Sequence, residues 1–286
     1  MGLRRYFRER KKNKKGIKQV KVGNYQLLAD NQHPIEDYLT KFNYYSRNLA
    51  RIAKYIENKY PKYGIVDVGA NIGDTIALLR SAGVDQFVYL IEGEASYFAL
   101  LQRNLEQFTN AKCIFTFLSE QDVIEAGFVE SDRGTAKMNL DEGKQTEVKK
   151  LDTVAVAEKF DTIKLLKTDT DGFDFKILRG SYNMIRKDKP VLFFEYDAAY
   201  LEELDPQGNN TLTNLQQMGY NTAIFYDNYG KLLISTTLSN TLQLQQLYTY
   251  MNNKDGAFPY YDVCLFHADD DALANEVIAK EMALYK

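Results

Sequence analysis

The stretch GIVDVGANIGDT, residues 64–75, decides the fold. Its apolar first half is typical of a short buried strand, and Gly69 and Gly73 let the backbone turn tightly and be approached closely. Asp74 or Thr75 can cap the amphipathic segment that follows. The pattern therefore predicts a strand, a glycine turn and a helix, which is the unit that builds nucleotide-type cofactor sites.

Charge distinguishes between the cofactors that such a turn can bind. A dinucleotide fold places a pyrophosphate at the helix N-terminus, but here Asp67 ends the strand and Asp74 begins the helix. Two carboxylates repel phosphate and suit a positively charged cofactor, such as S-adenosylmethionine with its ammonium and sulfonium groups. Glu92 ends the next apolar run, where an acid can accept hydrogen bonds from both ribose hydroxyls.

Each of these acids also has a plainer interpretation. Asp67 and Asp74 can be a turn residue and a helix cap, and Glu92 can be a solvated strand end. An NAD-dependent oxidoreductase shares the ribose acid and is one alternative, although a carboxylate-lined helix start suits pyrophosphate poorly. Together in one strand–helix–strand unit, the three acids favour S-adenosylmethionine.

Composition limits the class of protein. The chain has 286 residues, 45% of them hydrophobic and 26% charged, which is typical of a globular α/β protein. Its apolar runs are too short to cross a bilayer, and the N-terminus lacks a signal-peptide core. Cys113 and Cys264 lie in strand-like apolar runs, which predicts buried free thiols and is consistent with a cytoplasmic protein. Two cysteines and two histidines indicate no zinc site.

Charge is unevenly distributed along the chain. Residues 1–21 contain ten of the 36 Lys and Arg residues but one of the 39 acidic residues. This basic, flexible tail could rest on an anionic membrane at the inner face or simply be solvated. The remaining body is acidic, so a nucleic-acid substrate is not expected. The predicted organisation is a tail over 1–21, a helical cap over 22–63 and a Rossmann-like domain over 64–286, with an insertion near 128–150.

Strand and helix patterns alternate after the cap, which predicts an α/β fold with a mainly parallel, doubly wound sheet. A β-hairpin is expected over 222–234, and the last strand, 261–266, is expected to be antiparallel. The expected helices are 35–60, 95–108, 153–160 and 173–187, and the expected strands before the hairpin are 113–118, 163–168 and 191–196.

A second polar cluster follows two of these strands. Lys167, Asp169 and Asp171 alternate at the end of one strand, and Glu195 ends the next. Carboxyl ends of parallel strands form the ligand-binding edge. We expect Asp169, with Glu195 or Asp171, to remove a proton from an acceptor hydroxyl or to hold a Mg²⁺ ion that lowers its pKa. The plainer interpretation is a solvated loop with an internal Lys–Asp pair.

The sequence at these two clusters resembles the FkbM-type methyltransferases. The resemblance covers roughly residues 65–195 and is carried by VDVGANIG at 66–73, LD at 151–152, KTDTDG at 167–172, FDFKILRG at 173–180 and PVLFFE at 190–195. It implies a class I Rossmann-like methyltransferase that transfers a methyl group from S-adenosylmethionine to an oxygen of a sugar or natural product.

The resemblance also indicates site residues. Asp169 and Asp171 match the family's acidic loop, where Glu is usual in place of Asp171, and Gly93 stands where a proline commonly follows the ribose acid. Ser119 matches a turn beside the adenine. Combined with the glycine turn, the predicted cofactor-binding residues are Asp67, Gly69, Ala70, Asn71, Gly73, Asp74, Glu92, Gly93 and Ser119.

The predicted catalytic residues are Asp169, Asp171, Glu195, Lys167 and His33, and Asp169, Asp171 and Glu195 are also the predicted metal ligands. His33 precedes the first helix and is an alternative base. His267 is expected to be structural, because an antiparallel last strand ends away from the active edge. The function expected is O-methylation of a sugar hydroxyl on a glycan or glycoconjugate. The alternatives are a non-catalytic cofactor-binding or scaffolding protein at a membrane surface, and the oxidoreductase.

Overall fold

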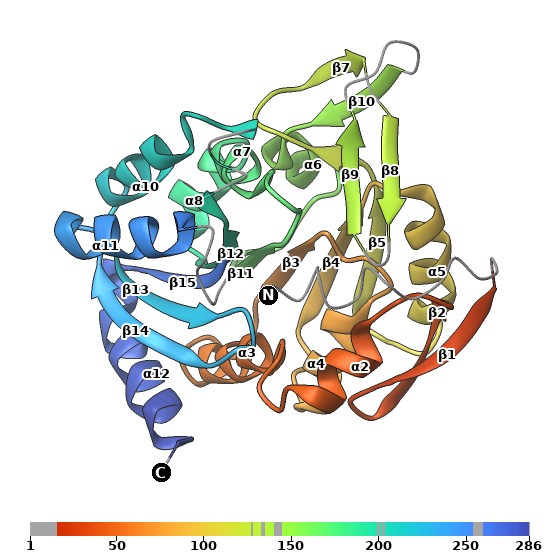
Figure 1. Cartoon of the computed structure of the whole chain (residues 1–286), viewed down its shortest axis with the longest axis horizontal. Helices are drawn as coiled ribbons and strands as arrows, with labels where there is room; N and C mark the ends of the chain where they lie inside the picture. Colours follow the sequence, from red (N-terminus) through yellow and green to blue (C-terminus); the bar gives the residue numbers. More distant parts are fainter. Residues whose placement is uncertain are drawn as a thin grey trace.

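The computed structural model describes residues 16–126, 128–132, 135–139, 145–198, 201, 204–253 and 260–285. Its centre is an eight-stranded sheet with the order β14-β13-β15-β12-β11-β3-β4-β5 (Figure 1). The parallel strands are β3 (Gly64–Val68), β4 (Phe87–Glu92), β5 (Ala111–Phe115), β11 (Ile163–Thr168) and β12 (Val191–Tyr196).

Two strands of this sheet run against the others. β15 (Tyr261–His267) pairs antiparallel with both β12 and β13 (Tyr220–Asp227), and β14 (Leu232–Thr237) pairs antiparallel with β13. The predicted mainly parallel sheet, its antiparallel last strand and the hairpin near residues 222–234 are therefore confirmed.

Helices cover both faces, because alternate strand residues supply two separate cores. Ile65 of β3 and Leu165 of β11 belong to one core, whereas their neighbours Val66 and Leu166 belong to the other. The first core packs against α2 (Ile35–Lys41), α3 (Arg47–Lys59), α4 (Asp74–Ser81), α5 (Ala95–Leu105) and α12 (Asp271–Ala283). The second packs against α6 (Leu151–Ala157), α7 (Asp174–Arg179), α8 (Tyr182–Asp188), α10 (Gly208–Gln217) and α11 (Thr241–Asn252).

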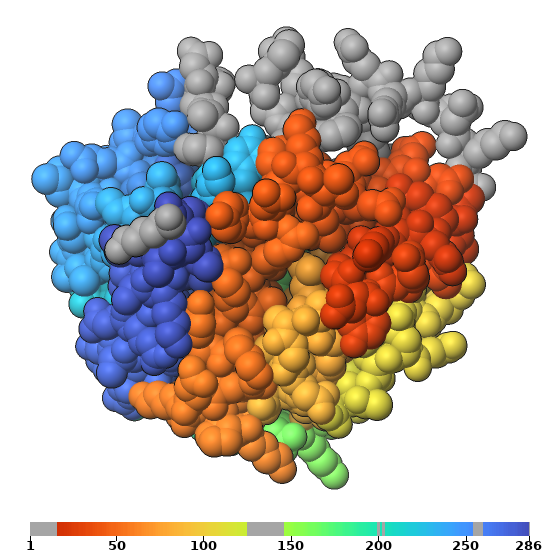
Figure 2. All heavy atoms as spheres, turned by 90° about the horizontal axis from the view of Figure 1, so that it is seen from below, coloured from red at the N-terminus to blue at the C-terminus, as the bar shows by residue number. Residues whose placement is uncertain are grey.

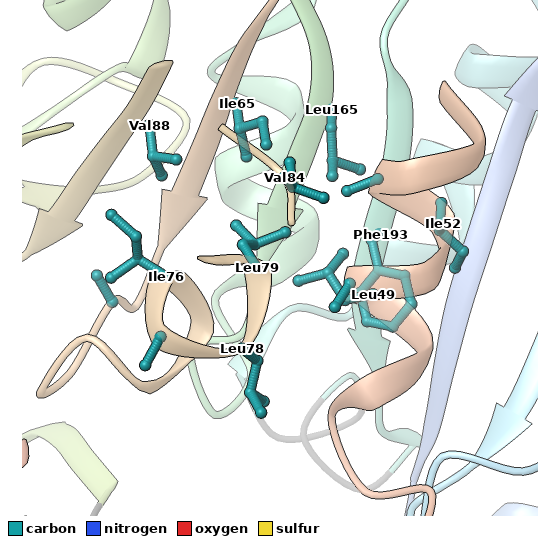
Figure 3. Packing of buried hydrophobic residues seen from close by; sticks show 14 of the residues in the cluster. Leu49, Ile52, Ile65, Ile76, Leu78, Leu79, Val84, Val88, Leu165 and Phe193 are labelled. Carbon is teal, nitrogen blue, oxygen red and sulfur yellow. The ribbon is translucent and has the colours of Figure 1, made fainter. Parts of the chain in front are cut away.

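The first face is visible in Figure 2, where α12 in blue lies beside α3 in orange, with α4 in lighter orange next to it. Figure 3 shows the packing beneath these helices. Leu49 and Ile52 of α3 and Leu79 of α4 lie against Leu165 and Phe193 of the sheet. This packing holds the loop before α4 at the edge of the sheet where the strands end.

The N-terminal region differs from the prediction. Residues 1–15 lie outside the described residues, but the rest of the expected tail enters strand β1 (Ile17–Val22), which pairs with β2 (Tyr25–Asp30). Val20 and Val22 are fully buried, Lys21 between them is exposed and Lys18 is half-buried, so the basic composition concealed a half-buried strand. The expected cap is thus a hairpin followed by two helices. The expected helix 35–60 breaks between α2 and α3, where Ser46 has φ +54°.

The insertion also differs in detail. The expected strand 113–118 divides into β5 and β6 (Phe117–Leu118), and β6 joins a small sheet with β7 (Val123–Ala126) and β10 (Gln145–Lys149). Between them, β8 (Phe128–Asp132) and β9 (Thr135–Asn139) form an antiparallel hairpin. The expected helix 173–187 divides at Gly180, whose missing side chain admits the Ser119 carbonyl: an added Cβ would lie 2.2 Å from that oxygen.

One buried amide joins the N-terminal hairpin to the domain. Asn104 of α5 is 2% exposed; its Nδ2 donates to the carbonyls of Leu28 (2.9 Å) and Ile72 (2.8 Å), and its Oδ1 accepts from the Leu28 N–H (2.7 Å). The hairpin lies beside α5 in Figure 1. A single side chain therefore satisfies three backbone groups of two distant segments.

We expect Asn104→Leu to lower the free energy of unfolding by about 2–4 kcal/mol, because each buried backbone group left without a partner costs about 1–3 kcal/mol. Urea denaturation followed by circular dichroism measures this change. Gln107→Ala is the matched control, since Gln107 is exposed and also donates to the hairpin, at Gln26 O. An Asn104→Leu protein as stable as the control would contradict the assignment.

Candidate active site

The loop between β3 and α4, residues 69–73 and called here the cofactor loop, turns within five residues. Gly69 has φ +75° and Gly73, the residue before α4, has φ +87°. An added Cβ on Gly69 would lie 2.1 Å from the carbonyl oxygen of Asp169. Glycine is therefore required here for a second reason, because the loops that follow β3 and β11 are in contact. The two predicted clusters thus meet at one edge of the sheet.

Glu92 holds the cofactor loop from the neighbouring strand. Its side chain is buried; Oε2 accepts from the N–H of Asn71 (2.8 Å) and Oε1 accepts from the N–H of Glu94 (2.7 Å). Burial raises the pKa of Glu92, which these N–H groups partly offset. Each carboxylate oxygen has a further lone pair, so Glu92 can hold the loop and still accept a ligand hydroxyl.

His33 approaches the same loop from the N-terminal side. Its Nε2 lies 3.0 Å from Asn71 Oδ1, and its Nδ1 accepts from the Ile35 N–H at 3.3 Å. Because Nδ1 accepts, the proton of the neutral ring is on Nε2, which donates to Asn71. His33 was predicted as an alternative base; in this tautomer Nε2 is engaged by Asn71 and Nδ1 by Ile35.

Lys167 and Asp67 form a buried ion pair in the middle of the sheet. Lys167 Nζ lies 2.9 Å from Asp67 Oδ1, 3.5 Å from Asp169 Oδ2 and 3.4 Å from the Gly69 carbonyl. Burial lowers the pKa of Lys167, but the charges of Asp67 and Asp169 outweigh it and raise that pKa above its ordinary value. Lys167 thus stays protonated. The cofactor contact predicted for Asp67 stays a prediction, since its carboxylate is fully buried against this ammonium.

The other acidic residues lie around this pair. The side chain of Asp169 is 58% exposed, Asp171 sits in a left-handed turn with φ +50°, and Glu195 is buried. Glu195 lines a small pocket, and its Oε1 accepts no hydrogen bond from the described residues. Burial, and the charges of Asp169 and Asp171, raise the pKa of Glu195 well above its usual range.

The predicted metal site does not form. Within the described ranges, no group of three or more His, Cys, Asp or Glu side chains converges as a metal ion requires. Asp169 lies against the Lys167 ammonium, whereas Glu195 is buried at the end of the next strand. The donor set of Asp169, Asp171 and Glu195 therefore does not fit Mg²⁺.

The remaining predicted cofactor residues lie around the same loop. Ala70 is buried and its N–H, like that of Gly69, donates to the Ile91 carbonyl at 3.0 Å. Asp74 is the first residue of α4, half-buried, and burial raises its pKa. Gly93 faces the Phe117 ring, which an added Cβ would meet at 2.2 Å. Ser119 is buried and its N–H donates to the Lys149 carbonyl.

Sequence reasoning missed Asp262. It lies at the start of β15, opposite Glu195 of β12 and Tyr226 of β13. Because β15 is antiparallel, its first residues reach the edge where the parallel strands end, while His267 at its far end pairs with Tyr220 at the opposite edge. Burial and the charge of Asp169 raise the pKa of Asp262 to about 8.

Two tyrosines and one further acid complete the edge. Burial raises the pKa values of Tyr45 and Tyr260 well above 10, and the charge of Asp169 adds to the effect on both. Asp174 begins α7; burial and the Asp169 charge raise its pKa to about 6, while its Oδ2 accepts from Thr170 Oγ1 at 3.1 Å. A ligand with a hydroxyl group at this edge would lie near Asp174 and Asp262, whose raised pKa values lie close to neutral pH.

A protein-family model matches the part of the chain that contains this site. The model of the methyltransferase FkbM domain matches residues 67–222, which include the cofactor loop, Glu92, Asp169 and Glu195. The chain belongs to the FkbM methyltransferase family. The resemblance stated from the sequence is therefore confirmed. No curated protein matches the chain.

Solved structures give weaker similarities. A methyltransferase FkbM from Methylobacillus flagellatus KT is 20% identical, with a TM-score of 0.39; the match covers 53% of this chain and 37% of that one. M. jannaschii TYW2 in complex with AdoMet is 12% identical, with a TM-score of 0.40; the match covers 89% of this chain and 88% of that one. A precorrin-6y C5,15-methyltransferase from Geobacter metallireducens GS-15 has 10% identity and TM-score 0.37, covering 72% and 80%. These similarities are too low to assign a substrate.

Two further predictions concern the cysteines and the absence of membrane-spanning helices. Cys264 is buried and Cys113 half-buried, and both are free thiols. None of the helices in the described ranges is long and apolar enough to span a bilayer.

The raised pKa of Asp262 predicts a pH dependence of stability. In an unfolded chain this carboxyl titrates near pH 3.9, whereas the folded protein keeps its proton until about pH 8. The stabilisation is full below about pH 4 and is lost as the pH rises through 8. Asp262→Asn stays neutral, so we expect its stability relative to the wild type to increase between pH 5 and pH 8.5.

Urea unfolding at the two pH values measures this difference. Asp37→Asn is the control, because Asp37 is an exposed carboxylate on α2. A difference between Asp262→Asn and wild type that does not change with pH would show that Asp262 titrates normally.

Proposed function

We propose that the protein transfers a methyl group from S-adenosylmethionine to the oxygen of a sugar hydroxyl on a glycan or glycoconjugate. The observation that carries the proposal is the placement of Glu92, whose Oε2 accepts from the Asn71 N–H and so lies against the cofactor loop. Membership of the FkbM family supports the donor. The sugar acceptor rests on the family resemblance and on the hydroxyl chemistry described below.

The residues present fit the donor. Gly69 leaves room where a side chain would collide with the Asp169 backbone, and Glu92 can accept hydrogen bonds from the ribose hydroxyls. Asp74, at the start of α4, disfavours a phosphate and favours a cationic ligand. When bound, S-adenosylmethionine supplies a methyl carbon whose bond to sulfur breaks as the acceptor oxygen attacks.

The protein's own contribution is positioning and proton removal. Correct orientation of the two reactants can supply about 7–11 kcal/mol of the barrier reduction. Asp169 is the exposed carboxylate at the edge and would accept the hydroxyl proton, while Lys167 holds it from the opposite side at 3.5 Å. Glu195, at the end of the next strand, is buried and has one carboxylate oxygen without a hydrogen-bond partner among the described residues.

Titration calorimetry with S-adenosylmethionine tests the donor. We expect one molecule to bind per chain, and Glu92→Gln to weaken binding about 10- to 100-fold, because hydrogen bonds to a charged group contribute about 1.5–3 kcal/mol. Glu106→Gln is the control: Glu106 is exposed just after the end of α5, so this variant should bind S-adenosylmethionine like the wild type. Binding of NAD in place of S-adenosylmethionine would support the oxidoreductase instead.

Transfer of the radiolabelled methyl group to a panel of hexoses, deoxyhexoses and their nucleotide-linked forms tests the acceptor. We expect Asp169→Asn to lower kcat about 10²- to 10⁴-fold, as loss of a general base does, with little change in donor affinity. Asp161→Asn is the control, because Asp161 is exposed and precedes the first residue of β11, whereas Asp169 follows its last. Unchanged turnover in Asp169→Asn would remove Asp169 from the mechanism.

A further inference from the structure

The N-terminal hairpin and the loop after it precede the family match, which begins at residue 67, yet they contact the cofactor loop. Two side chains make the connection. Asn104 joins the backbone of Leu28 to the carbonyl of Ile72, and His33 joins the same N-terminal segment to Asn71. Asn71 of the cofactor loop is therefore contacted from outside the matched residues, while Ile72 is linked to Leu28 through Asn104, which lies within them.

His33 is itself fixed in place. Its ring is buried and lies edge-on to Tyr97, with 6.3 Å between centroids. Its backbone N–H donates to the Asp30 carbonyl, and its own carbonyl accepts from Lys18 Nζ at 2.9 Å. With Nδ1 accepting from Ile35, the Nε2 proton has one direction to point, toward Asn71 Oδ1.

Asn71 transmits this restraint to the ligand-binding acid. It has φ +49°, a left-handed conformation that asparagine adopts more readily than other non-glycine residues and that contacts with its neighbours help to maintain. The support comes from two sides: the backbone N–H of Asn71 donates to Glu92, and its side-chain oxygen accepts from His33. Because Oδ1 of Asn71 accepts from His33, the Nδ2 end of the Asn71 amide faces away from the ring.

We propose that His33 is a positioning residue, which holds the cofactor loop in its binding conformation through Asn71. The proposal rests on the proposed function only for the identity of the ligand. It assigns a role in cofactor binding to the loop between β2 and α2, which precedes the matched residues. It also replaces the predicted role of His33 as a base.

Two substitutions separate the ring's contacts. In His33→Asn the shorter amide can accept from the Ile35 N–H as Nδ1 does but falls short of Asn71. In His33→Gln the longer amide can donate to Asn71 as Nε2 does. Because one hydrogen bond contributes about 0.5–1.5 kcal/mol, we expect His33→Asn to bind S-adenosylmethionine about two- to tenfold more weakly, with kcat at saturating donor unchanged. His33→Gln should bind within twofold of the wild type.

Amide hydrogen exchange of the ligand-free protein supplies a readout that does not depend on the ligand. We expect faster exchange of the amides of residues 69–73 in His33→Asn, wild-type exchange in His33→Gln, and similar melting temperatures for the two variants, since each loses one of the ring's two hydrogen bonds. The affinity loss should disappear in an Asn71→Ala background, since the contact is then absent in all variants.

The outcomes are distinct. Wild-type exchange of the loop in His33→Asn would overturn the inference, as would equal losses in both variants accompanied by lower melting temperatures, which indicate a structural role alone. Failure of the wild-type protein to bind S-adenosylmethionine, with the loop loosened in His33→Asn, would overturn the proposed function and leave the positioning role supported.

Discussion

The buried ion pair between Lys167 and Asp67 is the interaction on which the rest of the site depends. The two residues lie opposite each other on adjacent parallel strands, and Nζ lies 2.9 Å from Oδ1. Removing one member of such a pair leaves an uncompensated buried charge, which costs about 3–5 kcal/mol. Lys167 also reaches Asp169 and the Gly69 carbonyl. One ammonium thus ties together the two loops that carry the site.

Around that pair, backbone groups are held by side chains from distant segments. Asn71 is supported by Glu92 of β4 and by His33 of the N-terminal segment, and Ile72 by Asn104 of α5. A turn with several positive φ angles does not hold its shape by local preference alone. The cofactor loop is therefore best viewed as a strained segment whose conformation is determined by its neighbours, which include a hairpin that precedes the family's matched region.

The sequence was sufficient for the parallel core and insufficient for contacts that depend on long-range pairing. Strands β11 and β12 fall where their apolar runs predict, because a fully buried parallel strand is marked by its composition. Asp262 was missed although β15 was expected to be antiparallel, a direction that places the start of that strand at the active edge. The contact of His33 with Asn71 could not be predicted because the two residues lie 38 positions apart, and β1 was missed because Lys18 and Lys21 were assigned to the basic tail.

The pKa shifts at the edge suggest how ligand binding and catalysis are connected. Burial holds Glu195, Asp262 and Asp174 toward their protonated forms, because an ionised carboxylate is poorly solvated there. A cationic ligand placed among them favours the ionised forms instead, by Coulomb attraction. Under the proposed function, a cationic donor would therefore shift Glu195, Asp262 and Asp174 toward their ionised forms as it binds, beside Asp169, which accepts the hydroxyl proton.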